Sequence, residues 1–200
     1  MGRKDYFNSE EFKKCADFHG HICPGLSIGF RAAKAGMEWL KENRALDEEL
    51  VAVVENNACG TDAVQVLTGC TFGKGNFIFK DHGKQVFTFF SRKTGKGVRV
   101  SMIPRTIKSD PQHKELMERI GKNEASDEDR KEFQSLHQNR CREILEAPLE
   151  KIFKLKPIEM PLPSRAKIEA SLICDQCGEP TMASRLMEKD GKRLCLDCLA

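Results

Sequence analysis

Apolar residues recur at helical spacing along the first quarter of the chain. A first helix, covering about residues 9–19, places Phe12 and Cys15 on one face. The second predicted helix is longer, covering residues 26–43, and its apolar stripe consists of Leu26, Phe30, Ala33, Met37 and Leu40. Two helices are therefore expected before the first strand.

The next apolar segments have the length and composition of strands. Residues 51–54 form a short, fully apolar run rich in valine, which predicts a buried strand. Three further strand patterns follow at 76–80, 85–91 and 98–103, separated by glycine-containing turns. Successive strands joined by short turns predict an antiparallel meander.

Helical periodicity returns at residues 111–120 and 127–145, and the proline-rich segment 156–167 then predicts an extended connection. Helices followed by strands and again by helices favour an α+β fold, an antiparallel sheet with packed helices, over a parallel βαβ sheet. We expect this core domain to cover residues 1–165. A small C-terminal zinc-binding domain should cover residues 166–200.

The composition indicates the cellular compartment of the protein more clearly than its binding partners. The 33 basic and 30 acidic side chains leave a formal charge of +3, which is too balanced to predict binding to nucleic acid or an anionic membrane. The N-terminus lacks the apolar region of a signal peptide, and no apolar run is long enough to span a membrane. We therefore expect a cytoplasmic protein whose nine cysteines stay reduced and serve metal binding or thiol chemistry.

Four cysteines near the C-terminus have the spacing of a zinc site. The pattern is C-x2-C-x17-C-x2-C, and it consists of Cys174, Cys177, Cys195 and Cys198. Four thiolates suit tetrahedral Zn²⁺ and leave no open coordination position, so the predicted zinc is structural. Asp190-Gly191 between the two pairs predicts a hairpin, and so short a segment needs the binding energy of the metal to fold.

The segment FHGHICPG, residues 18–25, admits two interpretations. In an extended stretch His19 and His21 point to the same side, and Cys23 lies where the next helix begins. A helix N-terminus lowers the pKa of a nearby thiol, which would make Cys23 a good ligand or nucleophile. The alternative is a Pro-Gly turn with a buried histidine and a small buried cysteine, and these eight residues alone favour neither.

A second segment favours the site. Cys59-Gly-Thr-Asp62 lies between the predicted strand at 51–54 and a short helix, which is a kind of junction where ligand groups collect. The glycine-rich segment 69–76 resembles a P-loop only superficially, because it lacks G-x4-G-K-[ST] and opens a strand. Close packing of its backbone near a ligand is the better interpretation.

Other polar and thiol groups fit ordinary packing. His137 and Cys141 share one helical stripe with Phe133 and Ile144, which favours packing in the core over metal ligation. The basic segment 92–96 is typical of an exposed hairpin tip.

The motifs together resemble one protein family. C-x-x-F-H-G-H-x-C-P-G at 15–25, ENNACGTDAVQVLTGCTFGKGN at 55–76 and DHGKQVFTF at 81–89 are similar to the family of the E subunit of formylmethanofuran dehydrogenase. The terminal cysteines resemble the treble-clef zinc finger attached to many members. A treble clef normally continues into a helix, but only two residues follow Cys198.

The resemblance implies an α+β core that commonly forms homodimers and a pocket where the two motif segments meet. It implies direct metal contact by His21, Cys23 and Cys59, which suits a second Zn²⁺ or another transition metal with an open position. It also implies catalytic roles for Cys23, His19, Asp62 and Lys74, and a cofactor contact by Thr61.

Two functions follow. The first is a metal-binding accessory or stand-alone factor in one-carbon or molybdenum-enzyme redox metabolism, with subunits of a molybdenum or tungsten oxidoreductase as partners. Nothing in the chain resembles the pterin or Fe–S machinery of the parent enzyme. The second is a zinc-finger module without catalysis that docks a protein or nucleic acid. Acidic residues offset the basic hairpin of Lys189, Lys192 and Arg193, so nucleic acid is the less favoured partner.

Overall fold

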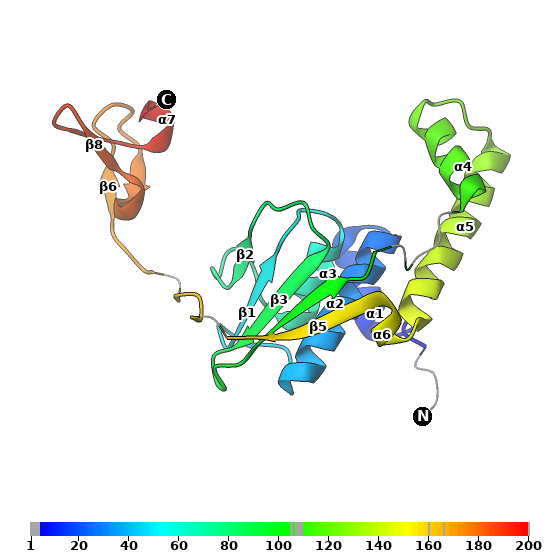
Figure 1. The fold of residues 1–200 in the computed structure, drawn as a ribbon. Coiled ribbons are helices and arrows are strands. Elements are labelled where there is room, and N and C mark those ends of the chain that lie inside the picture. Colours follow the sequence, from blue (N-terminus) through cyan, green and yellow to red (C-terminus); the bar gives the residue numbers. More distant parts are fainter. Residues whose placement is uncertain (1–4, 105, 107–109, 160, 166, 200) are drawn as a thin grey trace. The chain divides into compact units, whose positions relative to one another are not determined.

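The computed structural model describes residues 5–104, 106, 110–159, 161–165 and 167–199. The chain divides into two compact units, a core unit, Met1–Arg165, and a finger unit, Ala166–Ala200. The core unit combines a five-stranded sheet with helices (Figure 1). The α+β architecture predicted from the order of the elements is confirmed.

The elements of the core unit follow the predicted order. Its helices are α1 (Glu10–His19), α2 (Pro24–Leu40), α3 (Gly60–Thr68), α4 (Pro111–Gly121), α5 (Asp127–Glu146) and α6 (Leu149–Ile152). Its strands are β1 (Leu50–Val54), β2 (Phe77–Phe79), β3 (Val86–Ser91), β4 (Gly97–Met102) and β5 (Phe153–Ile158). The helices and strands expected between residues 9 and 145 are all present, with ends shifted by three residues or fewer.

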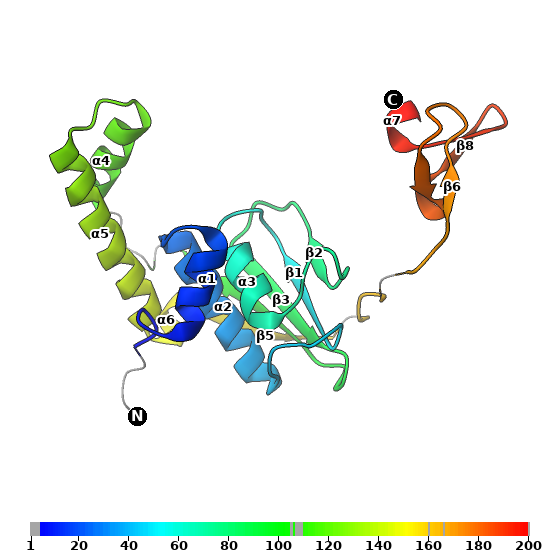
Figure 2. The same ribbon diagram turned by 180° about the vertical axis from the view of Figure 1, so that it is seen from behind.

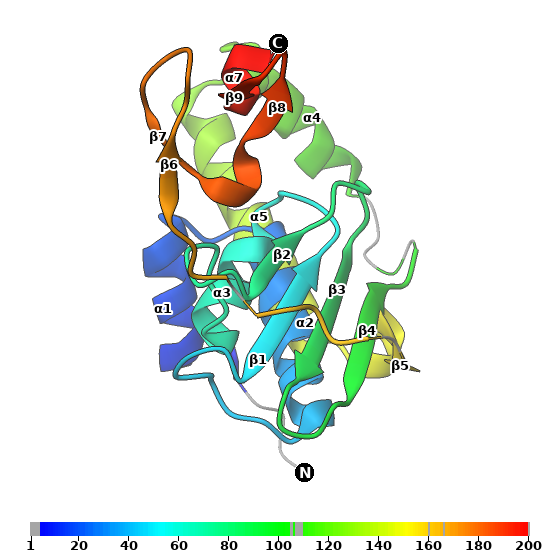
Figure 3. The ribbon, with the colours of Figure 1, turned by 90° about the vertical axis from the view of Figure 1, so that its left-hand side faces the viewer.

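The sheet has the strand order β2-β1-β3-β4-β5 (Figure 3). β1 pairs antiparallel with β3, but it pairs parallel with β2, and Val53 lies opposite Ile78. The predicted meander was therefore wrong for its first strand. The physical reason is α3. This helix is a crossover connection that carries the chain back to the start of the sheet, so that β2 runs beside β1 in the same direction.

β5 corrects a second prediction. The proline-rich segment from Lys156 was expected to be an extended connection, yet Phe153–Ile158 pairs antiparallel with β4. Pro157 lies opposite Val98 in this strand, and it is tolerated because β5 is an edge strand with no ladder on its outer side. The segment that leads toward the finger unit therefore begins after Ile158.

Helices cover one face of the sheet (Figures 1 and 2). α2 lies against β3 and β4, and α1 and α3 pack on α2. Because apolar and small residues occur all around α2, this helix is buried on most sides. Its Arg31 is a buried cation that donates to the backbone carbonyls of Leu145 and, at 2.9 Å, Ala147, and so stabilises the C-terminus of α5.

α4 and α5 form a helical hairpin that projects from the sheet (Figures 1 and 2). The buried Leu116 packs in this hairpin, and Arg119 pairs with Asp129 at 2.8 Å. His113 Nε2 lies 2.9 Å from His137 Nδ1, at hydrogen-bond distance. His137 thus packs between helices, as its place on an apolar stripe predicted.

The finger unit contains two short hairpins and a final helical turn. Its elements are β6 (Ser171–Ile173), β7 (Pro180–Met182), η1 (Ala183–Arg185), β8 (Met187–Lys189), β9 (Lys192–Leu194) and α7 (Leu196–Leu199). The predicted turn is confirmed, since Asp190 and Gly191 join β8 to β9 with φ angles of 53° and 73°. Across both units, none of the described helices is long and apolar enough to cross a membrane.

Candidate metal centre

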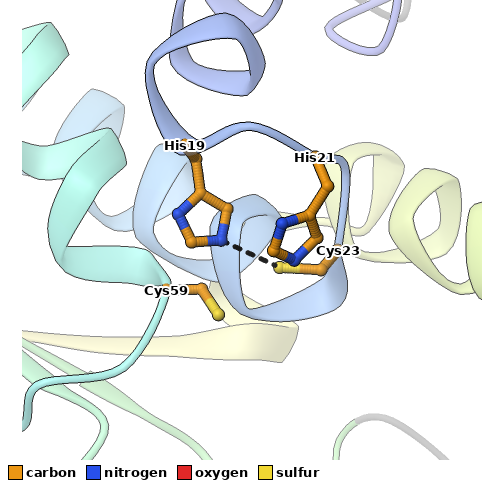
Figure 4. A group of neighbouring side chains, drawn as sticks. All are labelled: His19, His21, Cys23 and Cys59. Atoms are coloured by element: carbon orange, nitrogen blue, oxygen red, sulfur yellow. Dashed lines mark hydrogen bonds between the residues drawn. The ribbon is translucent and has the colours of Figure 1, made fainter.

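Four candidate ligand side chains lie together at helix ends of the core unit (Figure 4). His19 ends α1, Cys23 precedes α2, Cys59 precedes α3, and His21 lies between α1 and α2. One ligand atom of each residue lies within 4.8 Å of those of the other three. The two motif segments therefore meet as expected, and we call these four residues the His/Cys cluster.

Local backbone geometry positions the two histidines and the first cysteine. Gly20 has a φ of 88°, in the left-handed region, and this conformation ends α1 directly after His19. His21 therefore leaves the helix, and its ring centroid lies 4.3 Å from that of His19. Cys23 Sγ accepts the Leu26 N–H at 3.3 Å, so the thiol caps the N-terminus of α2.

A close contact between α2 and α3 determines where Cys59 lies. A Cβ atom on Gly29 would lie 2.0 Å from the Gly60 carbonyl oxygen, and one on Gly25 would lie 3.1 Å from Cys59 Cβ. Only glycine lets the two backbones approach so closely. The Cys59 thiol is thereby held beside the N-terminus of α2 and the Cys23 thiol.

Asp62 orients one cluster histidine. Its carboxylate lies 2.7 Å from His19 Nδ1, while His19 Nε2 lies 3.9 Å from Cys23 Sγ. A carboxylate on one ring nitrogen, with the other nitrogen directed at the metal position, is the usual arrangement around metal-binding histidines. Asp62, predicted as a catalytic group, is therefore placed to act through His19.

Burial opposes ionisation of the Cys23 thiol. Desolvation raises the pKa of Cys23 to about 11, although the Leu26 N–H acts in the opposite direction. The expected lowering of this pKa was therefore wrong, because the loss of water outweighs the helix N-terminus. A metal cation beside the sulfur would reverse the balance, since a coordinating thiol is deprotonated.

The donor set of the cluster fits a transition-metal ion. Two imidazole nitrogens and two sulfurs suit Zn²⁺ and similar ions, whose tetrahedral bonds separate such donors by about 3.3–3.8 Å. The observed distance of 3.9 Å between His19 Nε2 and Cys23 Sγ is close to that range. His21 is exposed, whereas the other three residues are buried or half-buried.

Two predicted site residues are engaged elsewhere. The Lys74 ammonium donates to the Asp47 carbonyl at 2.9 Å, so it is tied to the loop before β1 and is not brought into the cluster. The Thr61 hydroxyl donates to the Ala58 carbonyl at 3.0 Å, at the start of α3. Segment 69–76 packs through the buried Asn76, whose side-chain amide bonds backbone carbonyls.

The four cysteines of the finger unit form a second group. Their sulfur atoms lie within 4.8 Å of one another, and Cys177 Sγ lies 3.8 Å from Cys195 Sγ. Two thiolates on one tetrahedral Zn²⁺ are separated by about 3.8 Å, so the group fits this ion. Backbone N–H groups of Cys177, Cys195 and Gln176 lower the pKa of Cys174 to about 6, which favours its thiolate form.

Comparison with known families divides the chain into two matching parts. Residues 18–154 match the model described as FmdE, Molybdenum formylmethanofuran dehydrogenase operon. The chain belongs to the FmdE family. Residues 168–200 match the prokaryotic dksA/traR C4-type zinc finger, so this FmdE protein binds structural zinc in its finger unit. The resemblance predicted from the motifs is confirmed for both parts.

One curated relative and one solved structure are similar to this FmdE chain. The chain is 38% identical over 192 residues to a "Probable S-adenosyl-L-methionine-binding protein" of Archaeoglobus fulgidus, covering 92% of this chain and 51% of the relative, so it spans about half the length of that protein. A tungsten formylmethanofuran dehydrogenase FmdE-like protein from Syntrophus aciditrophicus superimposes with a TM-score of 0.66 at 24% identity, covering 100% of this chain and 97% of that chain. At this identity the likeness shows the fold.

Sequence reasoning missed the residues that position the ligands. Gly29 and Gly60 form the helix contact, and Arg31 ties α5 to α2. Two signals were available. Gly25 and Gly29 are small residues four positions apart in an apolar helix, and Arg31 is a cation within the same apolar run.

Proposed function

We propose that the FmdE core of this protein binds one transition-metal ion through His19, His21, Cys23 and Cys59, in addition to the zinc of the finger unit. The supporting observation is the convergence of two nitrogen and two sulfur donors, from two distant sequence segments, within 4.8 Å. The bond from Asp62 to His19 adds support, because it fixes the tautomer in which Nε2 is free to bind a metal.

The exposure of His21 determines what such an ion would do. Four bound protein ligands would close the site, whereas release of the exposed His21 imidazole would open a coordination position. His19, Cys23 and Cys59 would then hold the ion, which supplies Lewis-acid or redox chemistry when bound.

We place the protein among accessory or stand-alone factors of one-carbon and molybdenum-enzyme redox metabolism in the cytoplasm. The family description and the FmdE-like solved structure support this role, and nine free cysteines suit a reducing compartment. Subunits of a molybdenum or tungsten oxidoreductase are the proposed partners. The S-adenosylmethionine binding named for the Archaeoglobus relative is not extended to this chain, because about half of that protein lies outside the match.

The metal content of the purified chain tests the proposal. We expect two equivalents of metal per chain, falling to one in Cys23→Ser and to one in Cys174→Ser. Cys70→Ser, at a buried thiol outside both groups, is the matched control and should keep two equivalents. A single equivalent in the wild type, removed by Cys174→Ser alone, would contradict the core site. Anomalous scattering across metal absorption edges identifies each ion.

We also propose a homodimer that uses the α4–α5 hairpin. Met117 on α4 is 50% exposed, and Phe133 and Leu136 on α5 are half-buried, because two isolated helices cannot enclose their apolar sides. Sedimentation equilibrium should give twice the chain mass for the wild type and the chain mass for Met117→Glu. A monomeric wild type at micromolar concentration would contradict this.

The finger unit supports a second candidate function, a module that docks a protein. Its exposed large apolar side chains are Ile168, Leu172, Ile173, Met182, Met187 and Leu196. Such a surface favours a protein over nucleic acid, and the hairpin cation Arg193 already lies 3.9 Å from Asp175. Affinity capture with the full wild-type chain should recover a specific protein partner. The Met187→Glu chain should not recover that partner. Nucleic-acid binding that weakens steeply with salt would instead favour the other partner class.

A further inference from the structure

A cavity separate from the His/Cys cluster lies among α1, α2 and α3. Its volume is about 910 Å³, which is within the usual range for small-molecule sites. One face of α1 contributes Glu11, Lys14 and Phe18, at helical spacing, and other walls come from α2, α3 and the segments after them. None of the four cluster residues lines it.

Some charged groups of the cavity wall are already paired. The Lys34 ammonium lies 2.9 Å from each carboxylate oxygen of Glu11 and joins α2 to α1. Glu42 accepts the Ser91 hydroxyl at 2.6 Å. These pairs fix the walls, and they leave little charge of their own for a ligand.

Three other charged groups remain available. In the part of the chain that the structure describes, neither Lys14 on α1 nor Glu38 on α2 makes a side-chain hydrogen bond or ion pair. Arg44 uses Nε for the Val66 carbonyl at 3.0 Å, and among the described residues its other two guanidinium nitrogens make no hydrogen bond or ion pair. The cavity thus offers cationic and anionic groups together.

Apolar surface completes the cavity. Leu67 is buried, Met37 and Val66 are half-buried, and the Phe18 ring is 60% exposed although it lines the cavity. An exposed aromatic ring beside apolar walls offers contact area to a ligand with an apolar body.

We infer that this cavity binds a small zwitterion with an apolar, ring-bearing body. Its ammonium group would pair with Glu38, its carboxylate with Lys14 or Arg44, and its apolar body would contact Phe18, Met37 and Val66. The inference does not rest on the metal proposed for the His/Cys cluster. Peptide binding tests the cavity and metal content tests the His/Cys cluster, so either proposal can fail without the other.

The dipeptide Phe-Leu with free termini is a suitable probe. We expect saturable one-to-one binding to the full chain by calorimetry, with amide shifts near Lys14, Phe18 and Gln65 in NMR spectra. Acetylation of its N-terminus and amidation of its C-terminus each remove one charge and keep the body. Each change should weaken binding by about fivefold, as expected for loss of one exposed ion pair.

Protein variants supply the matching test. Lys14→Glu and Glu38→Lys should weaken Phe-Leu binding, and Gln65→Trp, which fills the cavity, should abolish it. Lys13→Glu, at the preceding position of α1 and outside the cavity lining, should bind like the wild type. Absence of saturable binding, binding of the acetylated or amidated peptide as tight as that of unmodified Phe-Leu, or unchanged binding in Gln65→Trp would overturn the inference.

Discussion

The two cysteine sites of this FmdE protein differ in what holds them in place. The His/Cys cluster lies at helix ends that pack on fully buried side chains such as Phe12, Leu26 and Phe30. In the described part of the finger unit, the buried apolar side chains are those of Cys174 and Leu194. Packing therefore holds the His/Cys cluster together without a metal, whereas the finger site needs its zinc in order to fold.

Removal of zinc should produce the largest contrast between the sites. Binding of structural zinc contributes about 10–16 kcal/mol in small finger domains, so Cys174→Ser should unfold the finger unit and leave the core unit folded. NMR spectra should show loss of dispersion for residues 167–199 alone. Cys23→Ser is the control and should leave the finger spectrum unchanged. If the NMR signals of the finger unit stay dispersed in Cys174→Ser, packing and not the metal keeps this unit folded.

Disruption of the helix contact should damage the core site without touching the finger. In Gly29→Ala the new Cβ would lie 2.0 Å from the Gly60 carbonyl, which should cost about 1–3 kcal/mol of unfolding free energy and displace Cys59. Chemical denaturation and metal content measure the two effects. Gly121→Ala is the control, because its Cβ would meet open space. A variant that keeps the core metal at full occupancy would refute the positioning role of Gly29.

Loss of the Asp62 carboxylate should weaken the core site while the fold stays intact. Asp62→Asn removes the charge beside His19 Nδ1, and such changes typically lower metal affinity by about 10–100-fold. Chelator competition measures this affinity. Asp17→Asn, on the exposed side of α1, should behave like the wild type. Equal affinity in both variants would refute the role of Asp62 in orienting His19.

The same contrast explains what the sequence could predict. The zinc site was predictable from spacing alone, because its ligands lie in two short, local pairs around one hairpin. The His/Cys cluster needed more, since Cys23 and Cys59 meet only through the packing of α2 on α3. The sequence identified the histidine and cysteine side chains as candidate ligands. The glycine contact that brings the two segments together depends on how α2 and α3 cross.

Errors arose where long-range structure decided the outcome. The pairing of β2 with β1 depends on a crossover through α3, and Pro157 lies in a strand because β5 is at an edge. The pKa of Cys23 follows burial, which a motif of eight residues does not report. Each error therefore reflects a contact with a segment far away in the sequence.

Acid should affect the α4–α5 hairpin, and this fourth and smallest effect separates the hairpin from both cysteine sites. Burial lowers the pKa of His113 and of His137. Arg140 lowers both further, His21 and His113 add to the lowering at His137, and Asp110 opposes it at His113. The unfolded chain therefore binds more protons below about pH 6.5. The hairpin is most stable above that pH and loses stability as the pH falls through it.

Hydrogen exchange measures this loss directly. When both rings are protonated, both facing nitrogens are donors, and the bond between His113 Nε2 and His137 Nδ1 is lost. Amide hydrogen exchange in α4, after division by the intrinsic rate at each pH, should accelerate between pH 7 and pH 5. The same measurement in α2 is the internal reference. His113→Gln keeps an N–H donor near the Nε2 position but does not titrate, so its acceleration should be weaker. If the two proteins respond equally, the acid sensitivity of the hairpin originates in other groups, because the pair at α4 and α5 would then contribute nothing to the proton uptake.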